Sequence, residues 1–389
     1  MLELLFLLLP VAAGYGWVMG RNSVRQAQRK QSSILSKHYY KGLNFLLSDE
    51  PDKAVDTLIK MINLDSDTVE THIAMGKFFR HRGELDRAIR VHQNLVSKEQ
   101  ISPTQRESAL KELGKDYVLA GFLERAENAF LQLLNSDKHF LDAQQQLFDI
   151  YQATKEWGRG IELAENMMEN NGDSDELCIR ISHFYCEQAA IYVRKDEINL
   201  AEKNLQKAIM ADQNTVRPWL MLGQIAISQK QYQTAIEYLQ QIPLRDISWL
   251  SEAVPLIEQS AEALGDMTQL EKILDEYWQQ CATSYLAKVN LMARKGMTKE
   301  AADVLLQQLR QHPTMKGFKT LMGLYIEQQA PSESMNGLVL LKGLVEEQIN
   351  QRPKYRCHSC GFSGRQIHWL CPSCKKWGQV KPIKGLDGE

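Results

Sequence analysis

The sequence has little glycine, little proline and almost no net charge. Its 389 residues include 23 glycines and 11 prolines, too few for a collagen-like or low-complexity chain. A formal charge of -2 gives no global field that would attract nucleic acid or an acidic membrane surface. Alternating strand-like runs are scarce, whereas Leu, Ala, Gln, Glu and Lys are abundant, and this composition favours helix.

The sequence also lacks the short motifs of several enzyme classes. It contains no H-E-x-x-H, no P-loop, no G-x-S-x-G and no G-x-G-x-x-G. Acidic residues are spread along the predicted helices at pairing distances from lysine and arginine, and no nucleophile stands out beside a base. We therefore predict that the protein is not an enzyme.

The seven cysteines do not form the pattern of a disulfide framework. Cys178, Cys186 and Cys281 are scattered through helical sequence, and the other four crowd the last tenth of the chain. An odd total with one tight cluster argues against paired disulfides. We expect the three scattered cysteines to be small buried apolar residues.

Residues 1–20 are predicted to be a transmembrane anchor. The stretch 4–20 carries no charge and lies at the short end of what spans a bilayer. Arg21 and Arg25 follow, so the positive-inside rule places the N-terminus outside and the rest of the chain in the cytosol. The rival interpretation, a cleaved signal peptide, lacks a basic first region. Residues 21–35 form a basic juxtamembrane linker.

Three small residues recur at four-residue spacing in the predicted anchor: Ala12, Gly16 and Gly20. This spacing places them on one helix face, where another transmembrane helix can approach closely. The alternative is chance, because glycine and alanine are common in such helices.

Residues 36–350 are predicted to form eight or nine tetratricopeptide (TPR) repeats. Small-residue pairs twelve apart recur in register, for example Gly76 with Ala88, Gly114 with Ala126 and Gly223 with Ala235. A further unit is placed at Gly296 and Ala301, and the gap before it leaves room for one degenerate repeat. Helix pairs with a 34-residue period stack into a superhelix, so we predict an all-α TPR-type solenoid.

The inner face of this solenoid is a candidate binding surface. The repeat register predicts that four cations project toward it: Lys77, Arg80, Lys111 and Lys115. A basic inner face would suit an acidic or carboxylate-ended peptide. The alternative, that these are solvated surface charges, is the commoner case.

The region 351–389 contains a metal-binding motif. Its four cysteines follow the pattern C-x2-C-x10-C-x2-C, which brings four thiolates around one ion: Cys357, Cys360, Cys371 and Cys374. Gly361 can adopt the positive φ that follows such a knuckle. Sulfur tetrahedra hold zinc and iron alike, and zinc is the default for a small structural site. His358 and His368 are expected to lie outside the ligand set.

Two other functions of this module stay open from the residues alone. It is basic and contains tryptophan, so it could bind nucleic acid, although its cations are also expected around a thiolate centre. It could also carry electrons as rubredoxins do. The module also contains three neighbouring apolar residues that could dock it on the repeats: Ile367, Trp369 and Leu370.

The order of anchor, TPR units and a knuckle reading Cys357-His-Ser-Cys360-Gly and Cys371-Pro-Ser-Cys374 resembles the lipopolysaccharide assembly protein B family of Gram-negative bacteria. The resemblance implies a single-pass inner-membrane adaptor with a periplasmic N-terminus and a cytoplasmic bulk. It implies three protein partners: the deacetylase LpxC, the membrane protease FtsH and a membrane sensor. The adaptor would present LpxC to FtsH for degradation and so regulate lipopolysaccharide synthesis. Of the family's functional residues, only the four cysteines are identified in this sequence. We expect no nucleic-acid partner. The sequence leaves open whether the protein forms a homo-oligomer.

Overall fold

The computed structural model describes residues 19, 69–99, 101–171, 174–328 and 333–389. The predicted anchor with Ala12, Gly16 and Gly20, and the linker at 21–35, lie outside the described residues apart from Met19. Within the described ranges, no helix has both the length and the apolar character needed to cross a membrane. The chain divides into two compact units, residues 1–154 and 155–389, which we describe separately.

The described part of the first unit is entirely helical. Its elements are α4 (Val69–His81), α5 (Leu85–Ser97), α6 (Pro103–Leu119), α7 (Leu123–Leu133) and α8 (Phe140–Thr154). Helix α4 packs with α5 and α6 with α7, and short turns join the two members of each pair. The predicted helical hairpins are therefore present.

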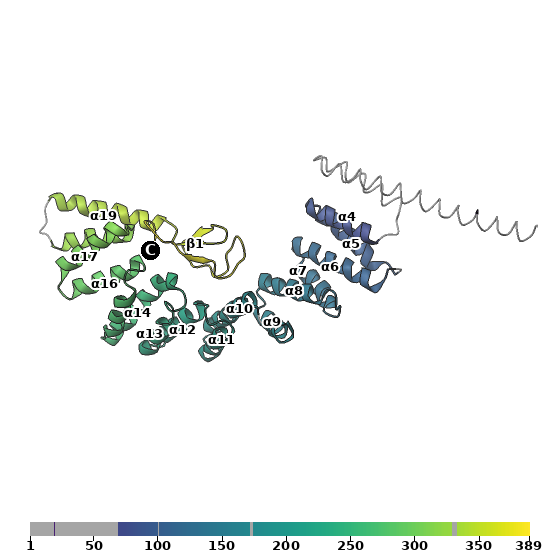
Figure 1. The fold of residues 1–389 in the computed structure, drawn as a ribbon, viewed down its shortest axis with the longest axis horizontal. Coiled ribbons are helices and arrows are strands. Elements are labelled where there is room, and N and C mark those ends of the chain that lie inside the picture. The colour runs from purple at the N-terminus through teal and green to yellow at the C-terminus, as the bar shows by residue number, and fades with distance from the viewer. Residues whose placement is uncertain (1–18, 20–68, 100, 172–173, 329–332) are drawn as a thin grey trace, which may run out of the picture. The chain divides into compact units, whose positions relative to one another are not determined.

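The second unit continues the same construction. Its helices are α9 (Trp157–Asn171), α10 (Asp175–Arg194), α11 (Ile198–Ala211), α12 (Arg217–Ser228), α13 (Tyr232–Leu239), η1 (Ile247–Trp249), α14 (Leu250–Leu264), α15 (Thr268–Tyr277), α16 (Ala282–Arg294), α17 (Thr298–Gln311), α18 (Met315–Gln328) and α19 (Glu333–Gln351). Helices α14 and α15 fill the gap in the repeat register. Within this unit the helices follow a curved path (Figure 1). The all-α TPR-type fold is thus confirmed.

The turns inside the hairpins share one backbone conformation. A residue in the left-handed region ends the first helix: Gly83 and Gly121 have φ of 78° and 79°, and Lys230 has φ of 62°. The next N–H then bonds back to the last helical turn, as in Glu84 N to Phe79 O at 2.9 Å. This Schellman closure satisfies carbonyls that the helix end would leave free.

Gly296 has a different role from the glycines of the other repeats. The unit predicted at Gly296 and Ala301 is formed by α16 and α17, and Gly296 follows α16 with φ of 83°. The Met297 N–H bonds to Met292 O at 3.1 Å, so Gly296 closes a Schellman turn. The position twelve before Ala301 is the buried Val289, and this repeat therefore lacks a packing glycine.

The glycines on the first helices give room to large side chains from the second helices. A Cβ on Gly114 would lie 2.7 Å from the Phe130 ring, and one on Gly223 would lie 2.6 Å from Leu239. Phe130 and Leu239 are both completely buried. The repeating small residue thus sets how closely the two helix axes approach.

Replacing Gly114 by alanine is expected to lower the free energy of unfolding by about 1–2 kcal/mol, because overpacking the fixed Phe130 ring outweighs the gain in helix propensity. Gly343 in α19 is the matched control, since a Cβ there meets nothing within 4 Å. Gly343→Ala should stabilise its helix by about 0.5–1 kcal/mol. Denaturant unfolding followed by circular dichroism measures both changes, and a stabilised Gly114→Ala variant would contradict the packing argument.

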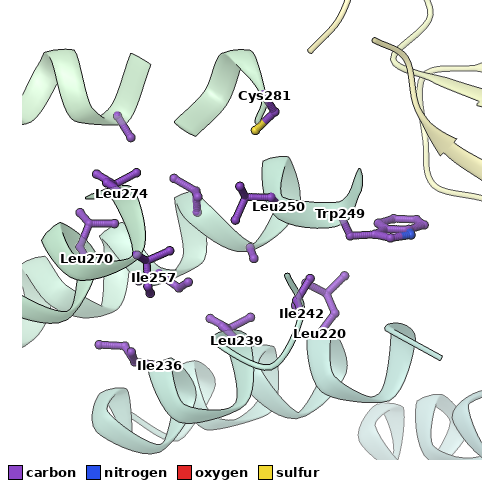
Figure 2. Packing of buried hydrophobic residues seen from close by; sticks show 14 of the residues in the cluster. Leu220, Ile236, Leu239, Ile242, Trp249, Leu250, Ile257, Leu270, Leu274 and Cys281 are labelled. Carbon is purple, nitrogen blue, oxygen red and sulfur yellow. The ribbon is translucent and has the colours of Figure 1, made fainter. Parts of the chain in front are cut away.

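A continuous hydrophobic cluster runs through the middle of the second unit. It is built from α12, α13, η1, α14, α15 and α16, with aliphatic side chains such as Leu239, Leu250 and Ile257 fully buried. Figure 2 shows Trp249 at the edge of this cluster, with its ring pointing away from the aliphatic side chains. That ring is where the last segment of the chain attaches.

The residues after α19 form a small sheet. Strand β1 (Tyr355–Cys357) lies between β2 (Ser363–Gly364) and β3 (Val380–Pro382), and both pairings are antiparallel. Tyr355 pairs with Pro382 and Cys357 with Val380. In Figure 1 this sheet lies inside the curve that the second unit's helices follow. Strands this short cannot bury a core of their own, so other contacts must hold the segment.

Candidate metal centre and its attachment to the helices

Two equivalent turns carry the four cysteines. In the first, Gly361 N donates to Cys357 O at 3.0 Å, and in the second, Lys375 N donates to Cys371 O at 3.0 Å. The residue that ends each turn has positive φ, 79° at Gly361 and 56° at Lys375. The expectation for Gly361 is confirmed, whereas Lys375 takes the same conformation without the freedom of glycine.

The four sulfur atoms form one cluster. All lie within 4.8 Å of one another, with 3.7 Å between Cys357 Sγ and Cys374 Sγ and 3.6 Å between Cys360 Sγ and Cys371 Sγ. A tetrahedron with metal–sulfur bonds of about 2.3 Å requires about 3.8 Å between sulfurs. A disulfide would need about 2.05 Å. The cluster therefore fits one metal ion held by four thiolates.

The surroundings of the sulfurs affect their protonation differently. A hydrogen bond from the backbone N–H of Phe362 lowers the pKa of Cys360 to about 6. Burial raises the pKa of Cys371 to about 11. Ion binding requires all four as thiolates, so a metal must displace the proton from Cys371. Cys371 is completely buried, while Cys360 is exposed.

The donor set accepts zinc or iron, because both ions take four sulfur ligands in a tetrahedron. Neither His358 nor His368 belongs to the sulfur cluster found among the described residues. The His368 ring instead meets Phe362 edge-on at 5.7 Å. Once bound, the ion would link the two turns and hold the small sheet in its fold.

Trp377 attaches the metal module to the start of the second unit. Its ring stacks on His183 of α10 with centroids 4.8 Å apart and planes 14° apart. Trp157 and Phe184 meet the same ring edge-on at 6.3 and 6.1 Å. Trp377 is 6% exposed. Burial and the nearby Arg217 cation keep the pKa of His183 well below its usual range, so this imidazole is neutral.

Trp369 makes a second aromatic attachment. It stacks on Trp249 with centroids 4.5 Å apart, and the Arg217 guanidinium lies 5.5 Å from its ring centre. Ile367 joins it in packing against the central cluster. The docking expected of Ile367 and Trp369 is confirmed, whereas Leu370 forms a β-bridge to Trp377 within the module.

Polar contacts fasten the rest of the module. Tyr355 donates its hydroxyl to Glu252 at 2.7 Å, and Lys381 pairs with Asp246 at 2.8 Å. The Glu389 carboxylate accepts from the backbone N–H of Thr283 at 2.9 Å, at the first turn of α16, where an anion is favoured. Lys316 of α18 also pairs with Glu389. The module therefore touches helices from α9 to α18.

The four candidate binding cations occupy α4 and α6, and their neighbours are acidic. Lys77 Nζ lies 3.2 Å from Glu112, and Arg80 bonds to Glu112 at 2.6 Å and to Asp116 at 2.9 Å. Asp116 also bonds to the buried His92 at 2.5 Å. Reasoning from the sequence missed this network, although Glu112 and Asp116 share one face of the same predicted helix at i and i+4.

Lys111 and Lys115 share a third carboxylate. Their Nζ atoms lie 3.2 and 3.9 Å from Asp142 Oδ2 of α8. All four cations are thus engaged within the first unit, and recognition of a partner by them stays a prediction.

Comparison with known proteins matches two parts of the chain to families. Residues 355–382 match the rubredoxin metal binding domain, which spans the sheet and all four cysteines. Residues 216–242 match the tetratricopeptide repeat, which covers α12 and α13.

Curated relatives match over the full length. Lipopolysaccharide assembly protein B of Escherichia coli strain K12 is 40% identical over 393 residues, covering 100% of both chains. The protein of the same name from Haemophilus influenzae is 33% identical over 397 residues, again covering 100% of both. Among solved structures, a crystal structure of MamA protein is 19% identical with a TM-score of 0.34, covering 47% of this chain and 93% of that one.

Proposed function

Because the chain belongs to the lipopolysaccharide assembly protein B family, we propose that it is a membrane-anchored adaptor that holds other proteins and catalyses no reaction. The TPR-type hairpins support this proposal, since stacked helix pairs expose extended surfaces for protein partners. The metal module supports it as well, because its four sulfurs are arranged as a closed structural site that ties the fold together.

The partners proposed for it are the deacetylase LpxC and the protease FtsH. The chain would present LpxC to FtsH at the inner membrane and so restrain lipopolysaccharide synthesis, under the influence of a membrane sensor. The uncharged stretch at residues 4–20 supports this arrangement. Confining an adaptor and a membrane protease to one surface raises their effective concentration for each other. Residues 12, 16 and 20 offer a face for a transmembrane partner.

Deleting residues 1–20 is expected to yield a folded protein that no longer lowers the cellular level of LpxC. The described helices pack on one another, so the fold is expected to survive, whereas confinement to the membrane is expected to be lost. Immunoblotting of LpxC in cells that carry the truncated chain as their only copy measures the effect, and circular dichroism checks the fold.

A matched variant separates confinement from specific contact. Here residues 1–20 are replaced by an unrelated single-span segment of the same orientation. Restored LpxC control in this variant means that confinement suffices, whereas a continued loss assigns a specific role to the sequence of residues 1–20, within which residues 12, 16 and 20 are the proposed contact face. Normal LpxC levels with the plain truncation would contradict the proposed function.

A further inference from the structure

The metal module and the segment around η1 together line a pocket. It has a volume of about 420 Å³, within the usual range for ligand sites of about 300–1,000 Å³. Strand β1 points Tyr355 and Cys357 inward and leaves Arg356 exposed between them. Side chains alternate along a strand, so Arg356 projects away from the metal centre and into the pocket lining.

The charge in this pocket is positive and only partly neutralised. Arg356, Lys381 and Lys384 all line it, and His358 lies beside them. Of the described residues that line it, only Asp246 is acidic, and this carboxylate already accepts Lys381 at 2.8 Å. Among the described residues, the Arg356 side chain makes one long contact, 3.4 Å from its Nε to the neutral Ser363 hydroxyl. Within that part of the chain, Arg356 and Lys384 therefore line the pocket without an opposite charge.

Three backbone donors of the pocket are already used. Ser248 N donates to Asp246 at 3.0 Å, His358 N to Gln379 O at 2.8 Å and Ile383 N to Lys354 O at 2.9 Å. Phosphate sites characteristically use free backbone N–H groups at the start of a helix. The charged donors of this pocket are its side-chain cations, and an arginine fork matches a carboxylate well.

The remaining lining is aliphatic. Ile247 contributes from η1, and Pro382 and Ile383 contribute from the end of β3. Among its described lining residues there is no phenylalanine, tyrosine or tryptophan on which a nucleic-acid base would stack. Aliphatic surface beside uncompensated cations complements a peptide in which acidic and aliphatic side chains are neighbours.

We propose that this pocket binds a short acidic–aliphatic segment of a protein partner, with Arg356 and Lys384 holding its carboxylates. This inference rests on the proposed adaptor function and assigns it a contact surface. Pro382 on the edge strand lacks an N–H, so the segment is held by side chains and does not add a strand to the sheet.

The test is fluorescence anisotropy of a labelled eight-residue peptide of alternating glutamate and leucine, titrated with the metal-loaded full chain in detergent. The double variant Arg356→Gln, Lys384→Gln is expected to bind roughly tenfold more weakly, because two charged contacts are lost. The control is Lys203→Gln, Lys299→Gln, which removes the same charge from exposed positions outside the pocket lining and should change affinity less than about twofold.

Three further measurements keep the outcome decisive. The metal content and melting temperature of each variant must match those of the parent chain. If Arg356→Gln loses metal, the single variant Lys384→Gln replaces the double variant in the binding assay. The variant Arg356→Glu, Lys384→Glu should prefer a lysine–leucine peptide. A glutamine–leucine peptide should bind weakly to every form.

Equal weakening in both double variants, or competition by inorganic phosphate as effective as unlabelled peptide, would overturn the inference. The same variants also separate it from the proposed function. If a variant that no longer binds the peptide still controls LpxC, the proposed pocket is wrong and the adaptor function stands. If the variant loses both peptide binding and LpxC control, the pocket and the adaptor function are both supported.

Discussion

Replacing Cys371 by serine is expected to abolish tight metal binding and to unfold residues 355–389. Cys371 is completely buried and contributes to the module's small core with Tyr355, Cys357 and Val380. The three strands are too short to persist without the ion, and structural metal sites of this kind supply folding energy directly. Elemental analysis should show metal falling from about one ion per chain toward zero. The melting temperature of the second unit should fall with it.

The control for this variant is Cys178→Ser, which removes a thiol from α10 outside the sulfur cluster. It should keep the parent chain's metal content and melt within a few degrees of it. Equal metal content and an unchanged melting temperature in Cys371→Ser would show that the four sulfurs do not act as one site. Chelation of the parent chain should reproduce the effect of Cys371→Ser.

The second large effect is expected from Trp377→Ala, which should release the module from the helices without removing its metal. The ring is buried and fills the space between His183, Trp157 and Phe184. Truncating a buried tryptophan typically costs about 3–5 kcal/mol. The sulfur ligands are not altered, so metal content should stay near that of the parent chain. Hydrogen–deuterium exchange should rise across residues 353–389 and on the α10 face around His183.

Trp278→Ala is the matched control, because Trp278 packs against a different cluster, beside Tyr285 and Leu305. It should lower the free energy of unfolding while leaving exchange in residues 353–389 unchanged. If Trp377→Ala loses metal as completely as Cys371→Ser does, folding of the module and its attachment would be one event. Unaltered exchange in Trp377→Ala would show instead that the aromatic stacks do not hold the module.

The parts of the fold that could be predicted depend on local sequence. Cysteine spacing defines each knuckle within a few residues, and the positive φ at Gly361 follows from the turn it closes. The repeat register was predictable because each hairpin repeats the same short-range contact. Gly296 shows where this reasoning fails, since one glycine fits a packing position or a turn equally well.

The attachment of the module could be predicted only in part. Apolar residues such as Ile367 and Trp369 in so small a module indicate that something covers them, but their counterparts lie far away in the sequence. Trp249 and His183 give no local sign of their role, because an aromatic residue on an amphipathic helix is ordinarily core. The partners of Lys77 and Arg80 were missed for a similar reason, as the acids that neutralise them lie on the next hairpin.

The module's contacts also have a mechanical consequence. A solenoid of stacked hairpins normally behaves as a spring, because small rotations between neighbouring repeats add up. In the second unit Trp377 is fixed to α10, while Glu389 is fixed to α16 and α18. Contacts between helices so far apart in the sequence are expected to stiffen this unit. Chelating the ion that folds the module should therefore also make the surface that partners meet more flexible.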